Sequence, residues 1–317
     1  MDITQVIPKD AIPSIDEPSF EDNFAGDADD RVVVPVVDGE PDRAYPLRIL
    51  NFHEIANDRI GAVPVAVTWC PLCGTVAVFD RRVAGRTLTF GVSGKLADDN
   101  LVMYDRETGS EWKQSLGECI DGELSGERLS VLSAIETTWA QYAASVDEPR
   151  VLSETDMESE AASTSDSPAR IDYDRNPYER YFASPGFGLA AHRNQDDERT
   201  WDRQDLDPKS RVIGLGDGAD AVGVPRPWVR DREKVLRVPV GGRDAVVFAP
   251  GSGTYAYEDP GFGFAHAGGE RFEGDGTTWH AVTGESEDGR TLERLPATWE
   301  FAFTWQDDHG PDRFAPG

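Results

Sequence analysis

One pattern of turn and aromatic residues occurs twice along the chain. Pro46 and Gly74 recur 179 positions later as Pro225 and Gly253, and after a deletion in the second copy the offset becomes 167. At 317 residues the chain is long enough to hold two cores of ordinary size. We therefore predict that one folding unit is present in two tandem copies.

The repeat divides the chain into five segments. They are an N-terminal extension (1–30), a first repeat (31–145), an acidic linker that braces the two lobes (146–210), a degenerate second repeat (211–305) and a C-terminal tail (306–317). Within the linker, the Ser-, Asp- and Glu-rich stretches 153–170 and 194–210 are expected to lack regular structure. Tyr178, Tyr181 and Phe182, which lie between these stretches, are expected to pack against the lobes.

Apolar and β-branched runs between Gly and Asp turns dominate each half. In the first half they predict strands at 31–37, 63–69, 75–82, 86–91, 101–105 and 128–132. Two helices are expected, one at about 46–56 and one that starts near Glu136 with Thr137 or Thr138 as its cap. Short links and few βαβ spacings predict an α+β fold, rich in antiparallel β-sheet, in which two pseudo-symmetric repeats form two lobes.

The sequence Cys70-Pro71-Leu72-Cys73-Gly74 places two thiols in a turn between two β-type runs. A thioredoxin-type dithiol needs a helix after its first Cys, because the helix dipole lowers the thiol pKa, and no helix pattern follows here. In a metal knuckle the same residues form a hairpin tip whose backbone N–H groups point at the sulfurs. The motif therefore favours a metal ion (zinc, copper or iron) over disulfide exchange, although the second C-x2-C pair that is usual in structural zinc sites is absent.

A soft-metal site at Cys70 and Cys73 needs further ligands from distant residues. His53 is the best candidate because it precedes the strand that delivers Cys70, and Cys119 and Met103 are the other soft donors. A single His or Met is more often a core residue than a ligand, so this alternative stays open for each of them.

Two acidic residues close to His53 are candidates for acid or base catalysis. Glu54 and Asp58 would lie beside an open coordination position and exchange protons there. In the second copy the two cysteines are replaced by Ala249 and Ser252, so only the first copy is expected to hold a soft metal. The alternative is that all residues of the second copy except those of the turns have changed by neutral drift, in which case these replacements say nothing about metal binding.

The chain has a formal net charge of −28 and only five Lys. An acidic, Lys-poor surface stays soluble when salt screens charge, so we expect a halophilic protein of a salt-adapted cytoplasm. The lack of basic stripes argues against nucleic-acid partners, and no apolar run approaches the roughly 20 residues of a membrane helix. The first residues lack a signal-peptide pattern, which agrees with a cytoplasmic location.

No nucleotide cofactor is indicated, because Gly91-Val92-Ser93-Gly94-Lys95 lacks the spacing of a phosphate loop. A cleft between two lobes would offer a site for a small molecule. In that case Arg232 and Arg237, which correspond to His53 and Asp58 in the second copy, are expected to contact an anion.

These motifs resemble those of domain-of-unknown-function family 3179, found in halophilic archaea and many bacteria, and the resemblance runs nearly end to end. Its hallmarks stand here as Lys9-Asp10-Ala11-Ile12-Pro13, Ala44-Tyr45-Pro46-Leu47, His53-Glu54-Ile55 with Asn57-Asp58, Cys70-Pro71-Leu72-Cys73-Gly74, Phe90-Gly91-Val92-Ser93-Gly94, Asp105 with Thr108-Gly109-Ser110, and Thr138-Trp139. The chain departs from the family pattern at Cys119, where a small residue is more usual, and at Glu111, where Leu is common. The resemblance implies that the His-Glu, Asn-Asp and Cys pairs form one signature, and it implies no particular reaction.

Two functions from different classes follow from the sequence. The first is a metal-binding protein in which Cys70, Cys73 and His53 hold the ion, with catalysis at an open metal position. The alternative is a non-catalytic, double-lobed structural or ligand-binding protein whose cysteines are a reduced or redox-active pair. The sequence does not decide whether the chain is an enzyme.

Overall fold

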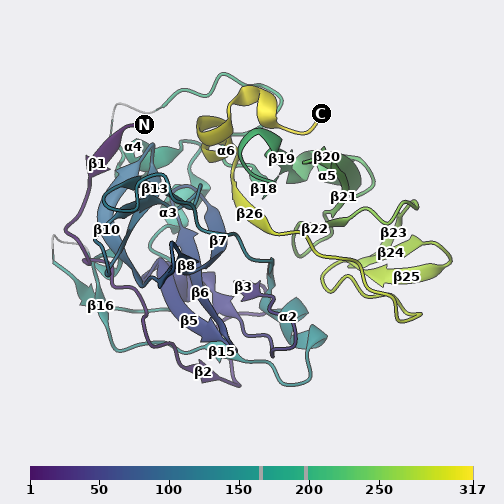
Figure 1. Cartoon of the computed structure of the whole chain (residues 1–317), viewed down its shortest axis with the longest axis horizontal. Coiled ribbons are helices and arrows are strands. Elements are labelled where there is room, and N and C mark those ends of the chain that lie inside the picture. Colours follow the sequence, from purple (N-terminus) through teal and green to yellow (C-terminus); the bar gives the residue numbers. More distant parts are fainter. Residues whose placement is uncertain (164–166, 196–198, 317) are drawn as a thin grey trace.

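The computed structural model describes residues 1–163, 167–195 and 199–316. Antiparallel β-sheet and short helices make up the fold, in agreement with the expected α+β class (Figure 1). The largest sheet has six strands in the order β19-β18-β26-β7-β6-β5, and all neighbours are antiparallel. These strands are β5 (Ile55–Ile60), β6 (Val63–Cys70), β7 (Thr75–Asp80), β18 (Arg211–Leu215), β19 (Val222–Pro225) and β26 (Ala297–Phe301).

The first half of the chain forms two further sheets of three or more strands, in the orders β1-β10-β11-β12-β13 and β14-β3-β4. Their strands are β1 (Ile3–Gln5), β3 (Arg31–Pro35), β4 (Tyr45–Pro46), β10 (Phe90–Ala97), β11 (Asn100–Asp105), β12 (Glu111–Lys113), β13 (Glu118–Asp121) and β14 (Ala134–Thr138). Helix α1 (Leu47–Leu50) follows β4, and α2 (Trp139–Ser145) follows β14. Thr138 caps α2 by accepting the backbone N–H of Gln141 at 3.4 Å, in agreement with one of the two caps expected.

The second half adds two three-stranded sheets, in the orders β20-β21-β22 and β23-β24-β25. Their strands are β20 (Val235–Val240), β21 (Arg243–Phe248), β22 (Tyr255–Glu258), β23 (Ala265–Gly268), β24 (Arg271–Gly274) and β25 (Thr277–His280). Helix α5 (Arg226–Asp231) follows β19 and α6 (Ala302–His309) follows β26. The β23-β24-β25 sheet projects from the body of the molecule (Figure 1).

The order of elements in the first half recurs in the second. In both halves, two paired strands lead into a short helix, and two antiparallel meanders follow. The final strand of each half then pairs with the first strand of that half and leads into a helix. The halves are joined, because β26 of the second half pairs with β7 of the first through Trp299 and Val76. Val34 and Phe248 also lie in one core cluster. The halves expected to form two lobes therefore share a sheet and part of a core.

The helix expected at about 46–56 is much shorter than the sequence suggests. Helix α1 ends at Leu50, and Glu54 has a left-handed φ of +58°, which a right-handed helix does not contain. Strand β5 starts at the next residue, so Asn57 and Asp58 lie in a strand. The strand expected at 128–132 forms only isolated bridges in the structure.

The stretch 153–170, expected to lack regular structure, contains two short strands, and the segment expected to pack against the lobes contains two short helices. A small hairpin of β16 (Glu158–Ser159) and β17 (Ala169–Arg170) is followed by helices α3 (Glu179–Ala183) and α4 (Gly188–Arg193). Residues 164–166 and 196–198 belong to the stretches predicted to be irregular and lie outside the described residues. The ring of Phe182 meets that of Phe301 edge-on, with 6.4 Å between ring centres.

Within the described ranges, no helix has both the length and the apolar character needed to cross a membrane.

Candidate functional site

The Cys70-Pro71-Leu72-Cys73-Gly74 turn is the tip of the hairpin between β6 and β7. Cys70 pairs with Thr75 across the ladder, and Gly74 has a φ of +61°, which glycine adopts without strain. A Cβ at Gly74 would lie 2.8 Å from a ring carbon of Phe301 and 2.9 Å from the guanidinium of Arg211. The turn therefore has the hairpin conformation that the sequence indicates, with a strand after it in place of a helix.

The two thiols of the tip face each other inside the protein. The Sγ atoms of Cys70 and Cys73 lie 3.0 Å apart, and both side chains are buried and free of disulfides. Cys73 Sγ also lies 2.9 Å from the backbone carbonyl oxygen of Asp99. A separation of 3.0 Å is longer than a disulfide bond, and a hydrogen bond between the two sulfurs accounts for it.

The surroundings make the two thiols unequal. Burial raises the pKa of the Cys70 thiol, but hydrogen bonds to its sulfur outweigh burial and lower that pKa below its ordinary value. They come from the Cys73 thiol and from the backbone N–H groups of Cys73, Leu101 and Leu72. Burial raises the pKa of Cys73, and the Cys70 sulfur raises it further. The surroundings therefore favour the thiolate form at Cys70 more than at Cys73.

Glu54 lies beside Cys70, at the end of the turn that follows α1. Its backbone N–H donates to the carbonyl of Leu50 at 2.8 Å, and its carbonyl accepts the N–H of Trp69 at 2.8 Å, so the residue is held against β6. Burial raises the pKa of Glu54 well above its usual range, and the charges of Cys70 and Glu160 raise it further. The surroundings thus favour the protonated form of Glu54 next to the thiol whose pKa is lowered.

A small cavity of about 140 Å³ opens onto these groups. Besides Glu54 and Cys70, its lining includes Glu160, Tyr178 and His192 from the linker. Burial raises the pKa of Tyr178 well above its usual range and lowers the pKa of His192, so both side chains are held in their neutral forms. The sequence carries no local signal that places linker residues at the thiols, because their approach depends on the packing of the linker.

His53 does not join the cysteines as the sequence suggests. Its Nδ1 lies 2.9 Å from the carbonyl oxygen of Pro13, and its Nε2 lies 2.7 Å from the hydroxyl of Tyr173. Burial lowers the pKa of His53 to about 4, although the hydrogen bond to Pro13 raises it. Because a carbonyl only accepts, Nδ1 carries the proton and Nε2 accepts from Tyr173, and both nitrogens are engaged.

The other candidates from the sequence also have partners of their own. Asp58 accepts a hydrogen bond from the hydroxyl of Tyr45 and pairs with Arg43 at 3.0 Å. Cys119 donates to the carbonyl of Asp121 at 3.3 Å, and Met103 is fully buried in the core. Among the residues that the structure describes, no three His, Cys, Asp or Glu side chains are grouped so as to hold a metal ion. The set of Cys70, Cys73 and His53 is therefore not assembled around one point.

The Thr108-Gly109-Ser110 signature lies in the turn between β11 and β12, and its polar groups hydrogen-bond to residues of the same turn. The carboxylate of Asp105 accepts the backbone N–H of Thr108 at 2.6 Å and the indole N–H of Trp112 at 3.0 Å. The hydroxyl oxygens of Thr108 and Ser110 lie 2.7 Å apart. These groups satisfy one another, so they stabilise the turn.

Comparison with known proteins places this site within a family. A family profile described as "Protein of unknown function (DUF3179)" matches residues 9–312, which include the thiol hairpin and Glu54. Neither a curated protein nor a solved structure matches the chain. Because the profile covers nearly the whole sequence, the chain belongs to the DUF3179 family of proteins of unknown function.

Proposed function

We propose that Cys70 and Cys73 are a thiol–disulfide redox pair that reacts with small disulfides, and that Glu54 protonates the leaving thiolate. The observation that carries this proposal is the 3.0 Å contact between two unequal thiols beside a protonated carboxyl. Disulfide exchange requires an attacking thiolate, a second thiol within reach and a proton for the leaving group. Cys70 and Glu54 line the small cavity, and Cys73 lies behind them in contact with Cys70.

The exchange takes two steps. In the first, the Cys70 thiolate attacks one sulfur of a disulfide RSSR′, a Cys70–SR bond forms, the S–S bond of RSSR′ breaks, and R′S⁻ takes the proton of Glu54. In the second, Cys73 releases its proton to solvent and its thiolate attacks the Cys70 sulfur, which expels RS⁻. Solvent then protonates RS⁻ and Glu54. The protein dithiol is oxidised to a disulfide, and RSSR′ is reduced to two thiols.

The size of the cavity limits the partner. Its volume of about 140 Å³ is well below the roughly 300 to 1,000 Å³ of ordinary ligand pockets. We therefore propose a disulfide of short-chain thiols and exclude a protein disulfide, which could not reach sulfurs that are buried in this way.

The test is treatment with bis(2-hydroxyethyl) disulfide, followed by denaturation, alkylation and peptide mapping. The expected product is an intramolecular Cys70–Cys73 disulfide with a mass lower by two hydrogens, while Cys119 remains alkylatable. The Cys73→Ser variant should stop at a mixed disulfide on Cys70, and the matched control Cys119→Ser should react as the wild type does. If Cys70 and Cys73 both remain reduced, the redox proposal is wrong.

The same turn favours a second candidate function, in which the two thiolates hold a zinc, copper or iron ion. Backbone N–H groups directed at the Cys70 sulfur support it, because such bonds stabilise metal-bound thiolates. Since His53 is engaged elsewhere, Glu54, which lines the same cavity as Cys70, would serve as a further donor. Elemental analysis of protein purified without a metal-affinity column separates the two functions: stoichiometric metal that is lost in Cys70→Ser/Cys73→Ser supports the metal site, and metal-free protein with an oxidisable pair supports the redox pair.

We also infer that the chain arose by duplication and that only its first half carries the thiol site. The recurrence of the element order supports this, and so does Glu233, the counterpart of Glu54, whose φ of +54° is also left-handed. At the second hairpin tip the cysteines are replaced by Ala249 and Ser252. The hydroxyl of Ser252 donates to Glu270 at 2.7 Å, so a hydroxyl–carboxylate contact replaces the thiol pair there.

A further inference from the structure

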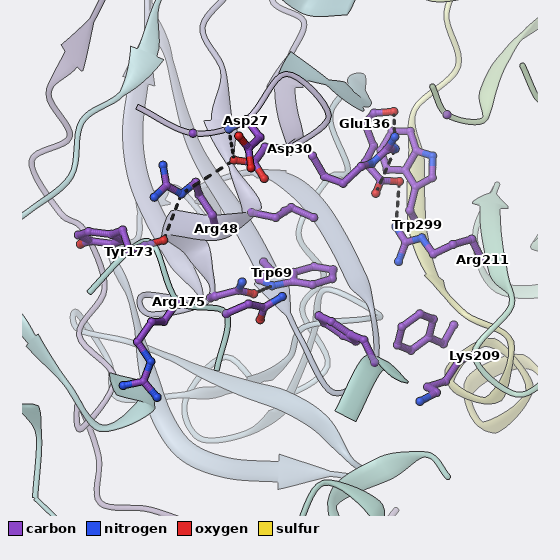
Figure 2. Close-up of a pocket in the computed structure, with 18 of the residues that line it drawn as sticks. Asp27, Asp30, Arg48, Trp69, Glu136, Tyr173, Arg175, Lys209, Arg211 and Trp299 are labelled. Atoms are coloured by element: carbon purple, nitrogen blue, oxygen red, sulfur yellow. Dashed lines mark hydrogen bonds and ion pairs between the residues drawn. The ribbon is translucent and has the colours of Figure 1, made fainter. Parts of the chain in front are cut away.

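A larger cavity lies where the two halves and the linker meet (Figure 2). Its volume is about 660 Å³, within the range of small-molecule pockets. The first half contributes Arg48 and Trp69, the linker contributes Tyr173, and the second half contributes Arg211 and Trp299. A ligand in this cavity would therefore contact all three parts of the chain.

The lining is basic although the protein is strongly acidic. Six basic side chains line the cavity against four acidic ones, in a chain with a formal net charge of −28. The basic side chains are Arg31, Arg48, Arg175, Lys209, Arg211 and Arg226. The lining thus carries an excess of positive charge although the net charge of the whole protein is negative, which indicates a site for an anion.

One buried carboxylate faces two arginines on the wall next to Trp299. Glu136 is 4% exposed and pairs with Arg211 at 2.8 Å and with Arg31 at 3.4 Å. Burial raises the pKa of Glu136, but the charges of Arg211 and Arg31 outweigh burial and lower it. Figure 2 shows the Glu136–Arg211 pair beside the Trp299 indole. Glu136 is therefore a charged carboxylate that neutralises only part of this wall.

Arg226 adds a third guanidinium to this group. Its Nη2 donates to the backbone carbonyls of Pro250 and Gly251 at 2.9 and 2.8 Å, while its Nε is buried without a hydrogen-bond partner. Over the described ranges no carboxylate lies within ion-pairing distance of Arg226, and the positive charge of Arg31 is nearby. One carboxylate thus faces three guanidinium groups.

Lys209 lies on the same side of the cavity as Arg211 (Figure 2). Its ammonium donates to the backbone carbonyls of Tyr181 and Ser184 at 2.6 and 2.5 Å. No described carboxylate forms an ion pair with it, and burial lowers its pKa. Neutral carbonyl groups therefore position the ammonium without neutralising its charge, which is available to an anion.

At the other end of the cavity acidic side chains outnumber basic ones, because Asp27, Asp30 and Asp174 accompany Arg48 and Arg175. Arg48 donates to the carboxylate of Asp174 at 2.9 Å and lies 3.9 Å from that of Asp30. Arg48 and Asp30 lie across the cavity from Arg211 (Figure 2). The attraction for an anion is therefore confined to the wall that carries Arg211, Arg226 and Lys209.

Aromatic rings line the space between the two ends. The indole N–H of Trp69 donates to Asn51 at 2.8 Å, and that of Trp299 donates to the carbonyl of Thr254 at 3.0 Å. Their polar atoms are thus satisfied by the protein, and the two rings are only 4% and 2% exposed. The half-buried ring of Phe182, which also lines the cavity, offers a ligand further apolar surface. Flat apolar groups pack favourably on such rings.

We propose that this cavity binds a small organic anion, whose carboxylate or phosphate lies against Arg211, Arg226 and Lys209. Its flat apolar body packs on Phe182 and on the exposed parts of the Trp69 and Trp299 rings. Two independent features meet in this assignment, the uncompensated cations on one wall and the aromatic surface beside them. The site is separate from the thiol pair and does not depend on the proposed redox chemistry.

The two residues that the sequence suggests for anion binding, Arg232 and Arg237, lie elsewhere in the structure. Arg237 pairs with Asp259 at 2.9 Å, and Arg232 donates to the carbonyl of Trp228 at 3.2 Å. Neither residue lines the large cavity. Arg232 follows directly after α5, the helix that begins with Arg226, and it serves as a matched control for that residue.

The test is titration with benzoate, phenyl phosphate and benzyl alcohol, followed by calorimetry and by the fluorescence of the tryptophans. We expect saturable binding of at least one anion, at least tenfold tighter than that of benzyl alcohol, and weaker binding as KCl increases. Tighter binding of benzoate than of phenyl phosphate assigns a carboxylate ligand, and the reverse order assigns a phosphate ligand.

Variants then localise the site. Arg226→Met should weaken anion binding at least tenfold, Arg232→Met should leave it unchanged, and Cys70→Ser/Cys73→Ser should retain it. Circular dichroism checks folding, and Lys209→Met replaces Arg226→Met if the latter does not fold. Equal binding of benzyl alcohol and the anions, no saturable anion binding, or equal effects of Arg226→Met and Arg232→Met would overturn the proposal.

Discussion

Trp69 and Cys70 are neighbours in β6 and line two different cavities. Trp69 lines the cavity of about 660 Å³, and Cys70 lines the one of about 140 Å³. Successive side chains of a strand point to opposite faces, so the hairpin tip forms a wall between the proposed anion site and the proposed thiol site. The carbonyl of Gly74 at this tip accepts a hydrogen bond from Arg211, which belongs to the larger cavity.

The Cys73→Ala substitution should raise the pKa of Cys70. The Cys73 thiol is one of the donors that keep this pKa below its ordinary value, and alanine removes that hydrogen bond. The rate of Cys70 alkylation by iodoacetamide, followed against pH by peptide mapping, should therefore have its midpoint at higher pH in the variant. Cys119→Ala is the control and should leave the midpoint in place. An unchanged midpoint in Cys73→Ala would show that the thiol does not stabilise the thiolate.

The Glu54→Gln substitution should make the free energy of unfolding less sensitive to rising pH. Burial raises the pKa of Glu54 in the folded protein, so above its ordinary value of 4.5 the folded state still binds a proton that the unfolded state has lost. Wild-type stability therefore falls as pH rises from this value through the raised one, and the amide removes that contribution. Urea unfolding between about pH 4 and about pH 9 measures both slopes. Equal slopes would contradict the buried, protonated carboxyl.

The His53→Gln substitution should make the free energy of unfolding less sensitive to falling pH. Burial lowers the pKa of His53 from 6.5 to about 4, so between these values the unfolded chain binds a proton that the folded protein does not. Wild-type stability therefore falls as pH falls through this window, by on the order of 3 kcal/mol at full shift. The variant should lose less stability over the same window in urea unfolding, and His266→Gln is the matched control. The same acid sensitivity in all three proteins would be the contrary result.

The Gly74→Ala substitution should destabilise the fold more than Gly85→Ala does. Both glycines have left-handed φ, +61° and +75°, which costs a substituted residue about 1 to 3 kcal/mol. A Cβ at Gly74 would also meet Phe301 at 2.8 Å, whereas nothing lies within 4 Å of one at Gly85. Thermal and urea unfolding of both variants measure the difference, which isolates the packing at the hairpin tip. Equal losses would show that the tip tolerates a side chain.

Features set by neighbouring residues could be predicted. The thiol hairpin follows from Gly74, which accepts a left-handed φ, and from the β-type runs on either side. The cap of α2 follows from the side chain of Thr138. The predicted helix at about 46–56 was wrong because Glu54 is held in a left-handed conformation by contacts with Leu50 and Trp69, and the second of these contacts is not local.

The sequence by itself determined the β-rich α+β class, the hairpin conformation of the thiol turn and the membership of the DUF3179 family, because these depend on local backbone preferences and on the spacing of residues along the chain. Only the tertiary structure decided that His53 turns to Tyr173 while Glu54 approaches Cys70, and that Lys209 and Arg226 face the same cavity as Trp69. These arrangements depend on how the linker packs and on the pairing of β26 with β7. The burial and charge that result come from residues far apart in the chain, which no local pattern encodes.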